Sequence, residues 1–476
     1  MYNVVLIMTD QHRFDALGCM GNKVIETPHL DDLAAHGTRF ECAYSPSPSC
    51  VPARACLLTG MRPWNAGVLG MGWGQGPMRN DYKHTLPGEL SAAGYHTQGI
   101  GKMHFHPQRA LNGYHNTVLD ESSRQGTPDF VSDYRRWFLK HAPDGADINS
   151  HGIDWNSCLA RPYHLDETLH ATTWTVNESI AFLERRDPTK PFFLKTSFAR
   201  PHSPYDPPRY YYDMYNQRED IPAPYHGEWD TIQDVPPEDA SSCALWHGIR
   251  RPEEIRRARA SYYGSITFID HQIGRLLFYL RRHQLYNDTL IIFTSDHGDM
   301  LGDHNLWRKT YAYEGSAHIP LLIKYPDSFG KPVPVSPSPV TLEDIMPTVL
   351  SVNGLPIPET VDGIDLSGLS YRGETGRAYG HGEHSGCYDH AYEVQYLYDA
   401  KMKYIWYSQT GIEQLFDLEA DRGESHDLSQ NPEYAEVLAL WRSRLVNELK
   451  NRNLGLTDGD RLVPLHFSRP IVSPYQ

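Results

Sequence analysis

The alternation of short apolar segments with helical segments constrains the fold of this chain more than any other feature of its sequence. Apolar segments of strand length lie at residues 3–9, 95–101, 192–198, 289–295 and 320–325. Between them run helical segments, of which 28–36 is the clearest, with a proline in its first turn. Such alternation is typical of a sheet covered by helices on both faces. We therefore predict an α/β fold built on a large, mostly parallel sheet flanked by helices.

The pattern changes near residue 376, where short polar strands replace the apolar ones. Predicted strands lie at 377–380, 393–398, 403–407 and 414–418, and a helix follows over 432–450. These elements predict a smaller antiparallel sheet with one helix. Because 476 residues exceed what one ordinary core accommodates, we expect two parts. They are a main domain over 1–375 and a C-terminal subdomain over 376–476 that ends in an extended tail.

Charge and hydropathy exclude two classes of partner. The formal net charge is −15, whereas a nucleic-acid surface needs clustered lysine and arginine. The longest apolar runs, such as 3–8 and 290–294, are far shorter than the roughly 20 residues of a membrane helix. We therefore expect no nucleic-acid binding and no membrane span.

Cysteine usage and the first residues bear on the cellular compartment. The seven cysteines are scattered and odd in number, which is not the pattern of a disulfide framework. The chain opens directly on a strand, without the basic region and cleavage site of a secretory signal. We expect a cytoplasmic protein, or a periplasmic or secreted one if a leader was removed. The oligomeric state is open, and a homo-oligomer is one alternative.

Cys50-Val51-Pro52-Ala53-Arg54 is the most informative short segment of the chain. A helix is predicted from near Pro52 to just before Gly60, which places Cys50 at a helix N-terminus, an end that favours anions. Taken alone, the segment has an ordinary explanation as a small buried cysteine ahead of a helix. Cys56, further along the same apolar helix, is expected in the core.

Two other segments place carboxylates directly after predicted strands. Thr9-Asp10-Gln11 follows the first strand, and Ser295-Asp296-His297-Gly298-Asp299 ends a later one. Ligands of open α/β sheets bind beyond the carboxyl ends of the strands, so these side chains are expected to converge. Either segment alone is an ordinary turn after a strand. Together they offer oxygen and imidazole ligands for one divalent cation.

Cations and imidazoles occupy similar places. Lys102 and His104 come after one predicted strand, His202 after another, and Lys309 follows the segment that contains Asp296. A lone lysine or histidine there is more often a solvated charge or a satisfied structural group. Each of them nevertheless lies at or after the end of a predicted strand.

The order and context of these motifs resemble the type I sulfatases, the formylglycine-dependent family of the alkaline-phosphatase-like superfamily. The run from Cys50 to Gly60 is similar to the family signature, in which the cysteine is oxidised to formylglycine. The resemblance covers about residues 3–325, and 413–424 is similar to a C-terminal sulfatase segment. The chain departs from the family at Asp10-Gln11, where two adjacent acids are common. That departure removes one negative charge from the metal site.

The resemblance implies that 1–375 is the catalytic domain and assigns its chemistry. A formylglycine-generating enzyme would convert Cys50, and one hydroxyl of the hydrated aldehyde would attack sulfur. One divalent metal would be present, with Ca²⁺ favoured and Mn²⁺ or Mg²⁺ as alternatives. The implied metal ligands are Asp10, Gln11, Cys50, Asp296 and His297. The implied catalytic residues are Cys50, Arg54, Lys102, His104, His202 and Lys309.

The same resemblance distributes roles among the catalytic residues. Arg54 would hold the hydrate, Lys102 would contact the sulfate, and His104 would stabilise or deprotonate the second hydroxyl. His202 and Lys309 would also contact the sulfate. Both are candidates for protonating the leaving oxygen.

The predicted substrate is a sulfate monoester on a small or terminal sulfated carbohydrate. Irregular polar segments at 70–82, 105–160 and 200–250 are long enough to wall a pocket. The aromatic residues available there to stack on sugars or to line an apolar rim are Trp137, Trp155, Tyr205, Tyr210, Tyr211 and Tyr212. The alternative is that they pack the loops together and the site accepts simple aryl sulfates. Residues 380–384 either meet the leaving group or form an exposed polar turn.

Other functions fit the same motifs. An arylsulfatase, or a phosphonate monoester or phosphodiester hydrolase, would use the same site, because related enzymes resemble this chain at the motifs around Asp10, Cys50 and Asp296. A non-catalytic anion-binding protein is disfavoured. It would need the cations but neither the cysteine nor the metal-binding acids.

Overall fold

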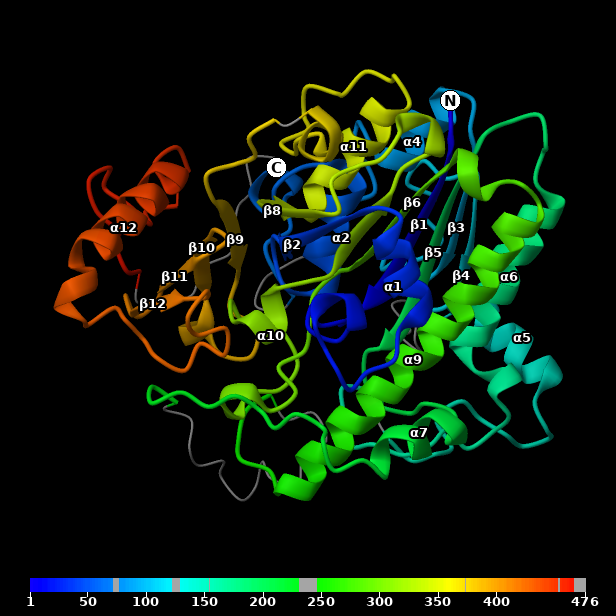
Figure 1. Ribbon diagram of the computed structural model, residues 1–476, viewed down its shortest axis with the longest axis horizontal. Helices are drawn as coiled ribbons and strands as arrows, with labels where there is room; N and C mark the ends of the chain where they lie inside the picture. Colours follow the sequence, from blue (N-terminus) through cyan, green and yellow to red (C-terminus); the bar gives the residue numbers. More distant parts are fainter. Residues whose placement is uncertain are drawn as a thin grey trace.

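A large sheet forms the centre of the molecule (Figure 1). The computed structural model describes residues 1–71, 77–121, 129–153, 155–230, 246–372, 374–452 and 454–465. Within them, eight strands form this sheet, in the spatial order β4 (Asn116–Leu119), β3 (His96–Gly101), β5 (Phe192–Pro201), β1 (Asn3–Asp10), β6 (Thr289–Ser295), β7 (Leu321–Lys324), β2 (Thr38–Tyr44) and β8 (Val335–Thr341). The predicted α/β fold is confirmed, and the strands predicted from the apolar segments are β1, β3, β5, β6 and β7.

The central strands are parallel and buried on both faces. Residues 4–8 of β1 are fully buried, and β6 is buried along its whole length. Continuous apolar runs of this kind are typical of parallel strands covered on both sides. Neighbouring strands from β4 to β6 run parallel, as do β2 and β8. β7 runs antiparallel to both its neighbours, which makes the sheet mostly parallel, as predicted.

The strands β2, β4 and β8 escape prediction from the sequence. β8 reads Val-Ser-Pro-Ser-Pro-Val-Thr, and its two prolines argue against a central strand because they cannot donate to a ladder. β8 lies at one edge of the sheet, where prolines are tolerated. β4 lies at the other edge and has four residues, too few to show an alternation.

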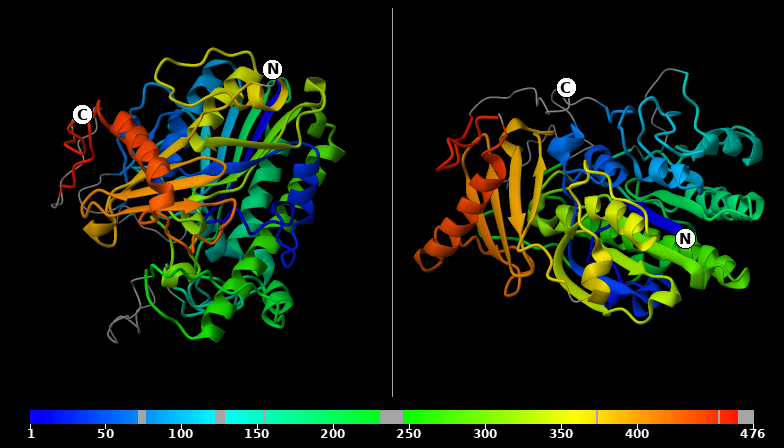
Figure 2. Two further views of the ribbon diagram at one scale, coloured as in Figure 1. Left: turned by 60° about the vertical axis from the view of Figure 1, so that its left-hand side comes forward. Right: turned by 90° about the horizontal axis from the view of Figure 1, so that it is seen from above.

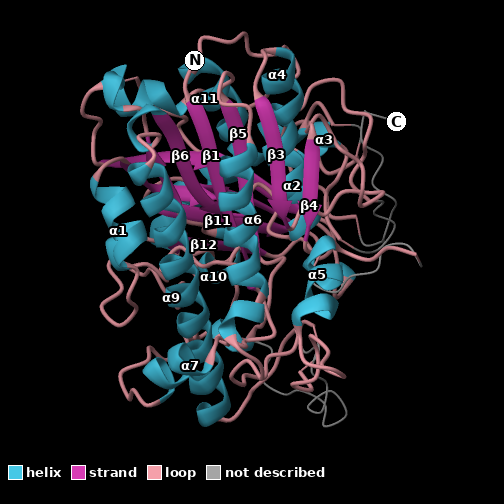
Figure 3. Ribbon diagram, turned by 90° about the vertical axis from the view of Figure 1, so that its right-hand side faces the viewer, coloured by secondary structure: helices cyan, strands magenta, loops and turns pink. Residues whose placement is uncertain are grey.

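Helices cover both faces of the large sheet, as predicted (Figure 3). α1 (Pro28–Ala35), α6 (Ala171–Arg185) and α9 (Pro252–Arg282) pack on one face. α2 (Cys50–Thr59), α4 (Leu86–Ala92) and α11 (Ile345–Val352) pack on the other. The connections contain α3 (Pro63–Ala66), α5 (Asp133–His141), α7 (Arg209–Asn216) and α10 (Glu314–Ala317). Among the described helices, none is both long and apolar enough to cross a membrane.

The predicted irregular walls contain regular elements where they are described. β4 and α5 lie within 105–160, and α7 lies within 200–250. Four stretches of these walls lie outside the described residues: 72–76, 122–128, 154 and 231–245.

A second, antiparallel sheet lies in the C-terminal region, as predicted (Figure 2). Its order is β12 (Glu413–Asp417), β11 (Met402–Tyr407), β10 (Val394–Tyr398) and β9 (Gly380–His384), and α12 (Ala435–Leu449) packs on it. The predicted bounds 377–380 are wrong, because the strand begins at Gly380. The alternative of an exposed turn at 380–384 is also wrong, because these residues form a buried strand. A Cβ atom at Gly380 would lie 2.1 Å from the Tyr398 ring, and one at Gly382 would lie 2.1 Å from the Tyr396 ring. The glycines make room for these rings, and their poor strand propensity hides β9 in the sequence.

Buried ion pairs join the C-terminal sheet to the part of the chain that contains the large sheet. Lys403 of β11 pairs with Glu314 of α10 (2.5 Å) and with Glu424 (2.9 Å), and all three side chains are buried. Tyr44 of β2 donates to the same Glu314 carboxylate. Removing one member of such a cluster costs about 3–5 kcal/mol, because a buried charge loses its partner. The division of the chain at residue 375 stays a prediction.

Candidate active site

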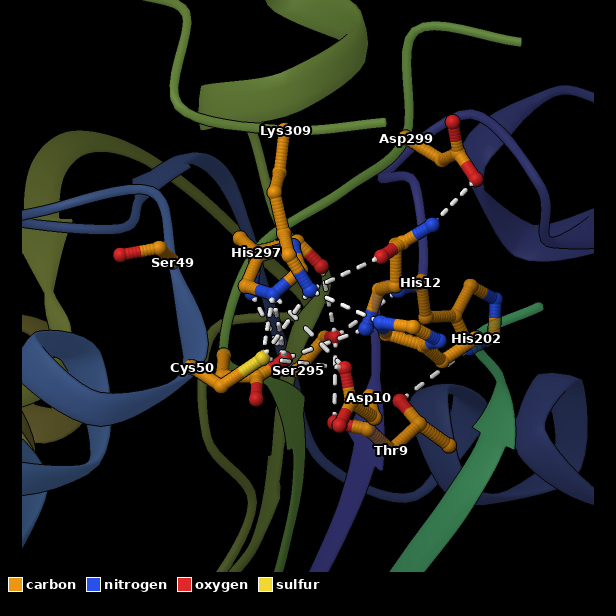
Figure 4. Close-up of polar contacts among 12 residues, drawn as sticks. Thr9, Asp10, His12, Ser49, Cys50, His202, Ser295, His297, Asp299 and Lys309 are labelled. Carbon is orange, nitrogen blue, oxygen red and sulfur yellow. Dashed lines mark hydrogen bonds and ion pairs between the residues drawn. The ribbon is translucent and has the colours of Figure 1, made fainter. Parts of the chain in front are cut away.

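The candidate site lies where the central strands of the large sheet end (Figure 4). β1 pairs Thr9 with Ser295 of β6 and Asp10 with Pro201 of β5. The segments that follow these three parallel strands therefore meet at one edge of the sheet. β3, next to β5, brings Lys102 to the same edge. This is the convergence that the sequence predicts.

A buried cluster of four side chains could hold a metal ion: Asp10, Cys50, Asp296 and His297. One ligand atom from each lies within 4.8 Å of the others. The Cys50 Sγ is 3.2 Å from His297 Nε2 and 3.7 Å from Asp10 Oδ1. His297 Nδ1 donates to the Gly298 carbonyl (2.8 Å), which leaves Nε2 directed into the cluster. Two carboxylates and an imidazole are donors that suit a divalent cation.

Gln11, the fifth predicted ligand, is oriented by Asp299. Its Nε2 donates to Asp299 Oδ2 (2.5 Å), so its Oε1 faces the site and accepts from Lys309 Nζ (3.2 Å). The Tyr205 hydroxyl donates to the same oxygen of Asp299 (2.6 Å). Asp299 belongs to the motif that the sequence offers, but its contact with Gln11 is not visible there.

Two predicted lysines lie against Cys50. Lys309 Nζ is 3.2 Å from the Cys50 Sγ, and Lys102 Nζ is 3.8 Å from it. Lys102 also forms an ion pair with Asp10. Burial raises the pKa of the Cys50 thiol, whereas Lys102 and Lys309 lower it, and the resulting pKa is about 6. The thiolate is therefore favoured at neutral pH.

Arg54 fixes one of the candidate metal ligands. It lies one turn along α2 from Cys50, and its Nε donates to Asp296 Oδ2 (2.9 Å). Its Nη1 donates to the Lys102 carbonyl (2.6 Å) and to the Ser197 hydroxyl (2.9 Å). The other oxygen of Asp296 accepts the amide N–H groups of residues 11 and 297. This network holds the Asp296 carboxylate in one orientation.

His202 is held in its neutral form. Its Nδ1 donates to the Ser203 carbonyl (2.8 Å), and its Nε2 accepts from Lys309 Nζ (2.8 Å). Burial, followed by the Lys309 charge, lowers the pKa of His202 well below its usual value. The Trp155 ring stacks on His202 with 4.2 Å between centroids, and Lys102 Nζ lies 5.2 Å from the centre of the same indole.

His104 lies just beyond β3, two residues after Lys102. Its backbone is left-handed (φ 59°), and its amide N–H donates to the Glu121 carboxylate (3.0 Å). Glu121 also accepts the N–H of Met103 (2.9 Å). These bonds fix the backbone at the end of β3, and the role of the His104 imidazole stays a prediction.

The aromatic residues predicted to stack on sugars lie in different surroundings. Trp155 lies over the site. Tyr205 and Tyr211 are buried in the packing around α9, which is the alternative in which these aromatics pack the loops together. Trp137 stacks on His141 of its own helix.

Ser49 and His384 form a contact that sequence reasoning misses. Ser49 immediately precedes α2, and its Oγ lies 2.7 Å from His384 Nε2 of β9. The two residues are 335 positions apart, and no motif links them.

Comparison with known proteins shows which of them resemble this chain. The family model described as Sulfatase matches residues 2–355, and the model described as N-sulphoglucosamine sulphohydrolase, C-terminal, matches residues 302–451. An arylsulfatase of Clostridium perfringens is 45% identical over 475 residues, which cover 97% of either chain. A choline-sulfatase of Rhizobium meliloti is 29% identical over 451 residues, which cover 90% of this chain and 83% of the relative.

Solved structures show the same fold. A phosphonate monoester hydrolase of Agrobacterium radiobacter superposes with a TM-score of 0.78 at 25% identity, and the match covers 94% of this chain and 95% of that one. The Sulfatase model alone spans well over half of the 476 residues. The chain therefore belongs to the sulfatase family and is a sulfuric ester hydrolase.

Proposed function

We propose that this chain hydrolyses a sulfate monoester with a formylglycine, made from Cys50 by a formylglycine-generating enzyme, as its nucleophile. The position of the Cys50 side chain carries this proposal. Lys309 Nζ lies 3.2 Å and Lys102 Nζ 3.8 Å from its sulfur, at the N-terminus of α2. A nucleophile that attacks an anionic ester needs such positive surroundings, because they offset the charge that develops in the transition state.

The proposed reaction has two halves. In the first, one hydroxyl of hydrated residue 50 gives its proton to a base and its oxygen bonds to sulfur, the bond from sulfur to the leaving oxygen breaks, and the leaving oxygen takes up a proton. In the second, the remaining hydroxyl gives its proton to a base, and the bond from its carbon to the oxygen that bridges to sulfur breaks. Sulfate departs with that oxygen, and the aldehyde re-forms and takes up water. A serine has no second hydroxyl on that carbon and could not complete the second half.

Lys309 is the better candidate for the proton donor. His202 Nε2 accepts from Lys309, so in this arrangement the lysine carries the proton that faces the site. A donor must reach the leaving oxygen within hydrogen-bond distance, directly or through one water. Lys102 then binds a sulfate oxygen, and Arg54 acts through Asp296. His104 is the proposed base for the second hydroxyl.

The donor set described above fits a divalent metal. We propose Asp10, Gln11, Cys50, Asp296 and His297 as its ligands. When bound, the metal acts as a Lewis acid that stabilises negative charge on the nucleophile and the sulfate. Most of the donors are oxygens, which favours Ca²⁺ over Mn²⁺ or Mg²⁺.

A small or terminal sulfated carbohydrate is the proposed substrate. The side chains of Cys50, Lys102 and His202 are fully buried, which supports a narrow site that would admit a chain end more readily than a chain interior. Trp155 offers an aromatic surface beside His202. The C-terminal family model, described for an N-sulphoglucosamine sulphohydrolase, also supports a sugar. The arylsulfatase relative supports the competing substrate, a simple aryl sulfate.

Phosphonate monoester hydrolysis is a second candidate activity. The superposition on a phosphonate monoester hydrolase and the presence of Gln11 in place of a second acid both favour it.

Steady-state rates on matched substrates test these proposals. Protein made with a formylglycine-generating enzyme would be assayed on sulfated monosaccharides and disaccharides, an aryl sulfate, and the matching aryl phosphonate. A higher kcat/KM for a sugar sulfate, after correction for leaving-group acidity, supports the carbohydrate. An aryl sulfate that exceeds every sugar refutes it, and a phosphonate that exceeds its matched sulfate makes the second candidate the main activity.

A further inference from the structure

The C-terminal sheet reaches the segment that carries the nucleophile. β9 runs beside residues 45–49, the loop that leads into α2. The Glu383 N–H donates to the Pro46 carbonyl (2.9 Å), and the Tyr396 hydroxyl of β10 donates to the Ser45 carbonyl. The loop before Cys50 is therefore bound by a sheet that follows it in sequence by more than three hundred residues.

A contact between two side chains links this loop to β9 at the residue that directly precedes Cys50. Ser49 Oγ lies 2.7 Å from His384 Nε2, and both side chains are buried. His384 Nδ1 donates to the Ser385 carbonyl (2.5 Å), so Nε2 is the acceptor and the Ser49 hydroxyl is the donor. Successive side chains of a strand point to opposite faces, which turns His381 and Glu383 away from this loop. His381 bonds Gln395 instead (2.9 Å).

Ser49 occupies the N-cap position of α2 without capping the helix. A serine at this position usually accepts an N–H of the first turn. The Ser49 side chain makes no such bond, and its hydroxyl is directed away from the Cys50 sulfur, as Figure 4 shows. The helix thus lacks a side-chain hydrogen bond at its N-cap, and the Ser49 hydroxyl donates to His384 of the C-terminal sheet instead. This exchange indicates that the contact does more than stabilise α2.

We propose that His384 is a positioning residue for the nucleophile at residue 50. By accepting the Ser49 hydrogen bond, it fixes the backbone from which the side chain of residue 50 projects. The inference rests on the proposed function, because it matters for catalysis only if residue 50 is the nucleophile. A displacement of about 1 Å can lower a rate about 10²-fold, so a bond one residue away has a measurable effect.

Four variants test the proposal: Ser49→Ala, His384→Ala, the double variant, and His384→Gln. Each rate is expressed per formylglycine, counted by mass spectrometry. His384→Ala should lower kcat about 10-fold to 10²-fold with KM little changed, because the substrate contacts stay in place. The double variant should fall no further than Ser49→Ala, since both changes remove one bond. His384→Gln should regain most of the activity, because its carbonyl oxygen can accept the same proton.

His381→Ala is the matched control. It removes a buried histidine from the same strand without touching the loop before Cys50, and it should keep kcat. An unchanged kcat in His384→Ala, strictly additive losses in the double variant, or an equal loss in His381→Ala would each overturn the proposal. Thermal unfolding of all variants identifies any loss that comes from a weakened fold.

A readout that does not need turnover separates this proposal from the proposed function. In protein made without the modifying enzyme, the alkylation rate of the Cys50 thiol reports its position. His384→Ala should change that rate, and His381→Ala should not. Wild-type protein that carries formylglycine but hydrolyses no sulfate ester would refute the proposed function, whereas an unchanged alkylation rate in His384→Ala refutes the positioning role.

Discussion

Two clusters of buried charge in this molecule differ in the groups that their lysines contact. At the carboxyl edge of the large sheet, Lys309 donates to the Cys50 sulfur, a glutamine oxygen and the neutral imidazole of His202. Between the two sheets, Lys403 lies between the carboxylates of Glu314 and Glu424. Both lysines are buried, so burial alone does not separate a reactive charge from a structural one.

The groups that each lysine contacts distinguish the reactive charge from the structural one. A lysine between two carboxylates already has its charge offset, and its loss should weaken the fold. A lysine directed at the proposed nucleophile and at a proton acceptor is placed to bind an anion that arrives with the substrate. Changes in the cluster around Lys309 should therefore alter activity at nearly constant stability. Changes in the cluster around Lys403 should alter stability at nearly constant activity.

Cys50→Ala should give the largest effect. It removes the proposed nucleophile and should lower kcat by at least ~10³-fold while the fold is kept. The rate of sulfate release measures the activity, and thermal unfolding measures the stability. In wild-type protein made with the modifying enzyme, mass spectrometry should find formylglycine in the peptide that contains Arg54. Full activity from a protein with an unmodified thiol at this position would contradict the mechanism.

Lys403→Met should lower the stability of the protein and leave its activity nearly unchanged. It leaves Glu314 and Glu424 together in a buried interface, which should lower the free energy of unfolding by about 3–5 kcal/mol. Denaturant unfolding measures the loss, and kcat of the folded protein should stay near that of the wild type. A large fall in kcat at unchanged stability would break the distinction between the clusters.

Asp296→Asn should weaken metal binding and turnover together, each by about 10²-fold. Calorimetric titration with Ca²⁺ and steady-state rates provide the two measurements. Asp303→Asn is a matched control, because Asp303 is a buried acid of the same segment that pairs with Arg13 and Arg259. It should leave the metal affinity unchanged. Activity that survives exhaustive chelation would exclude a required metal.

Asp303 should give the smallest effect, seen as a dependence of stability on pH. Burial raises the pKa of its carboxyl, but Arg13 and Arg259 lower it, and the pKa is about 2 in the folded protein against an ordinary 3.8. A depressed pKa stabilises the folded state above the unfolded value, here by about 2 kcal/mol. That contribution should be lost as the pH falls from about 4 to about 2. Denaturant unfolding of wild type and Asp303→Asn across this range checks it, and two parallel curves would contradict it.

The part of the site that the sequence predicts consists largely of residues that lie at or directly after the ends of predicted strands. Asp10, Lys102 and Asp296 each follow an apolar strand, and the rule for open α/β sheets brings such residues to one edge. The strand β9 is hidden because its glycines lower strand propensity while they admit tyrosine rings. A buried tyrosine such as Tyr205 is indistinguishable, in composition, from one that lines a pocket.

Contacts that tertiary packing creates are the part that the sequence does not supply. Gln11 and Asp299 are 288 positions apart, and Ser49 and His384 are 335 positions apart. Neither pair has a spacing or a motif that signals contact. Each depends on how two strands and their loops meet, which only the assembled fold determines.

Under the proposed function, the burial of Cys50 determines when its modification can take place. Its side chain has no exposed surface in the folded protein. Under the proposed function, the modifying enzyme must therefore reach this residue while the chain is still unfolded. Conversion and folding then compete as two rates, and a chain that folds first keeps its thiol until it unfolds again. Conditions that slow folding should raise the fraction of active molecules, whereas conditions that speed it should lower that fraction.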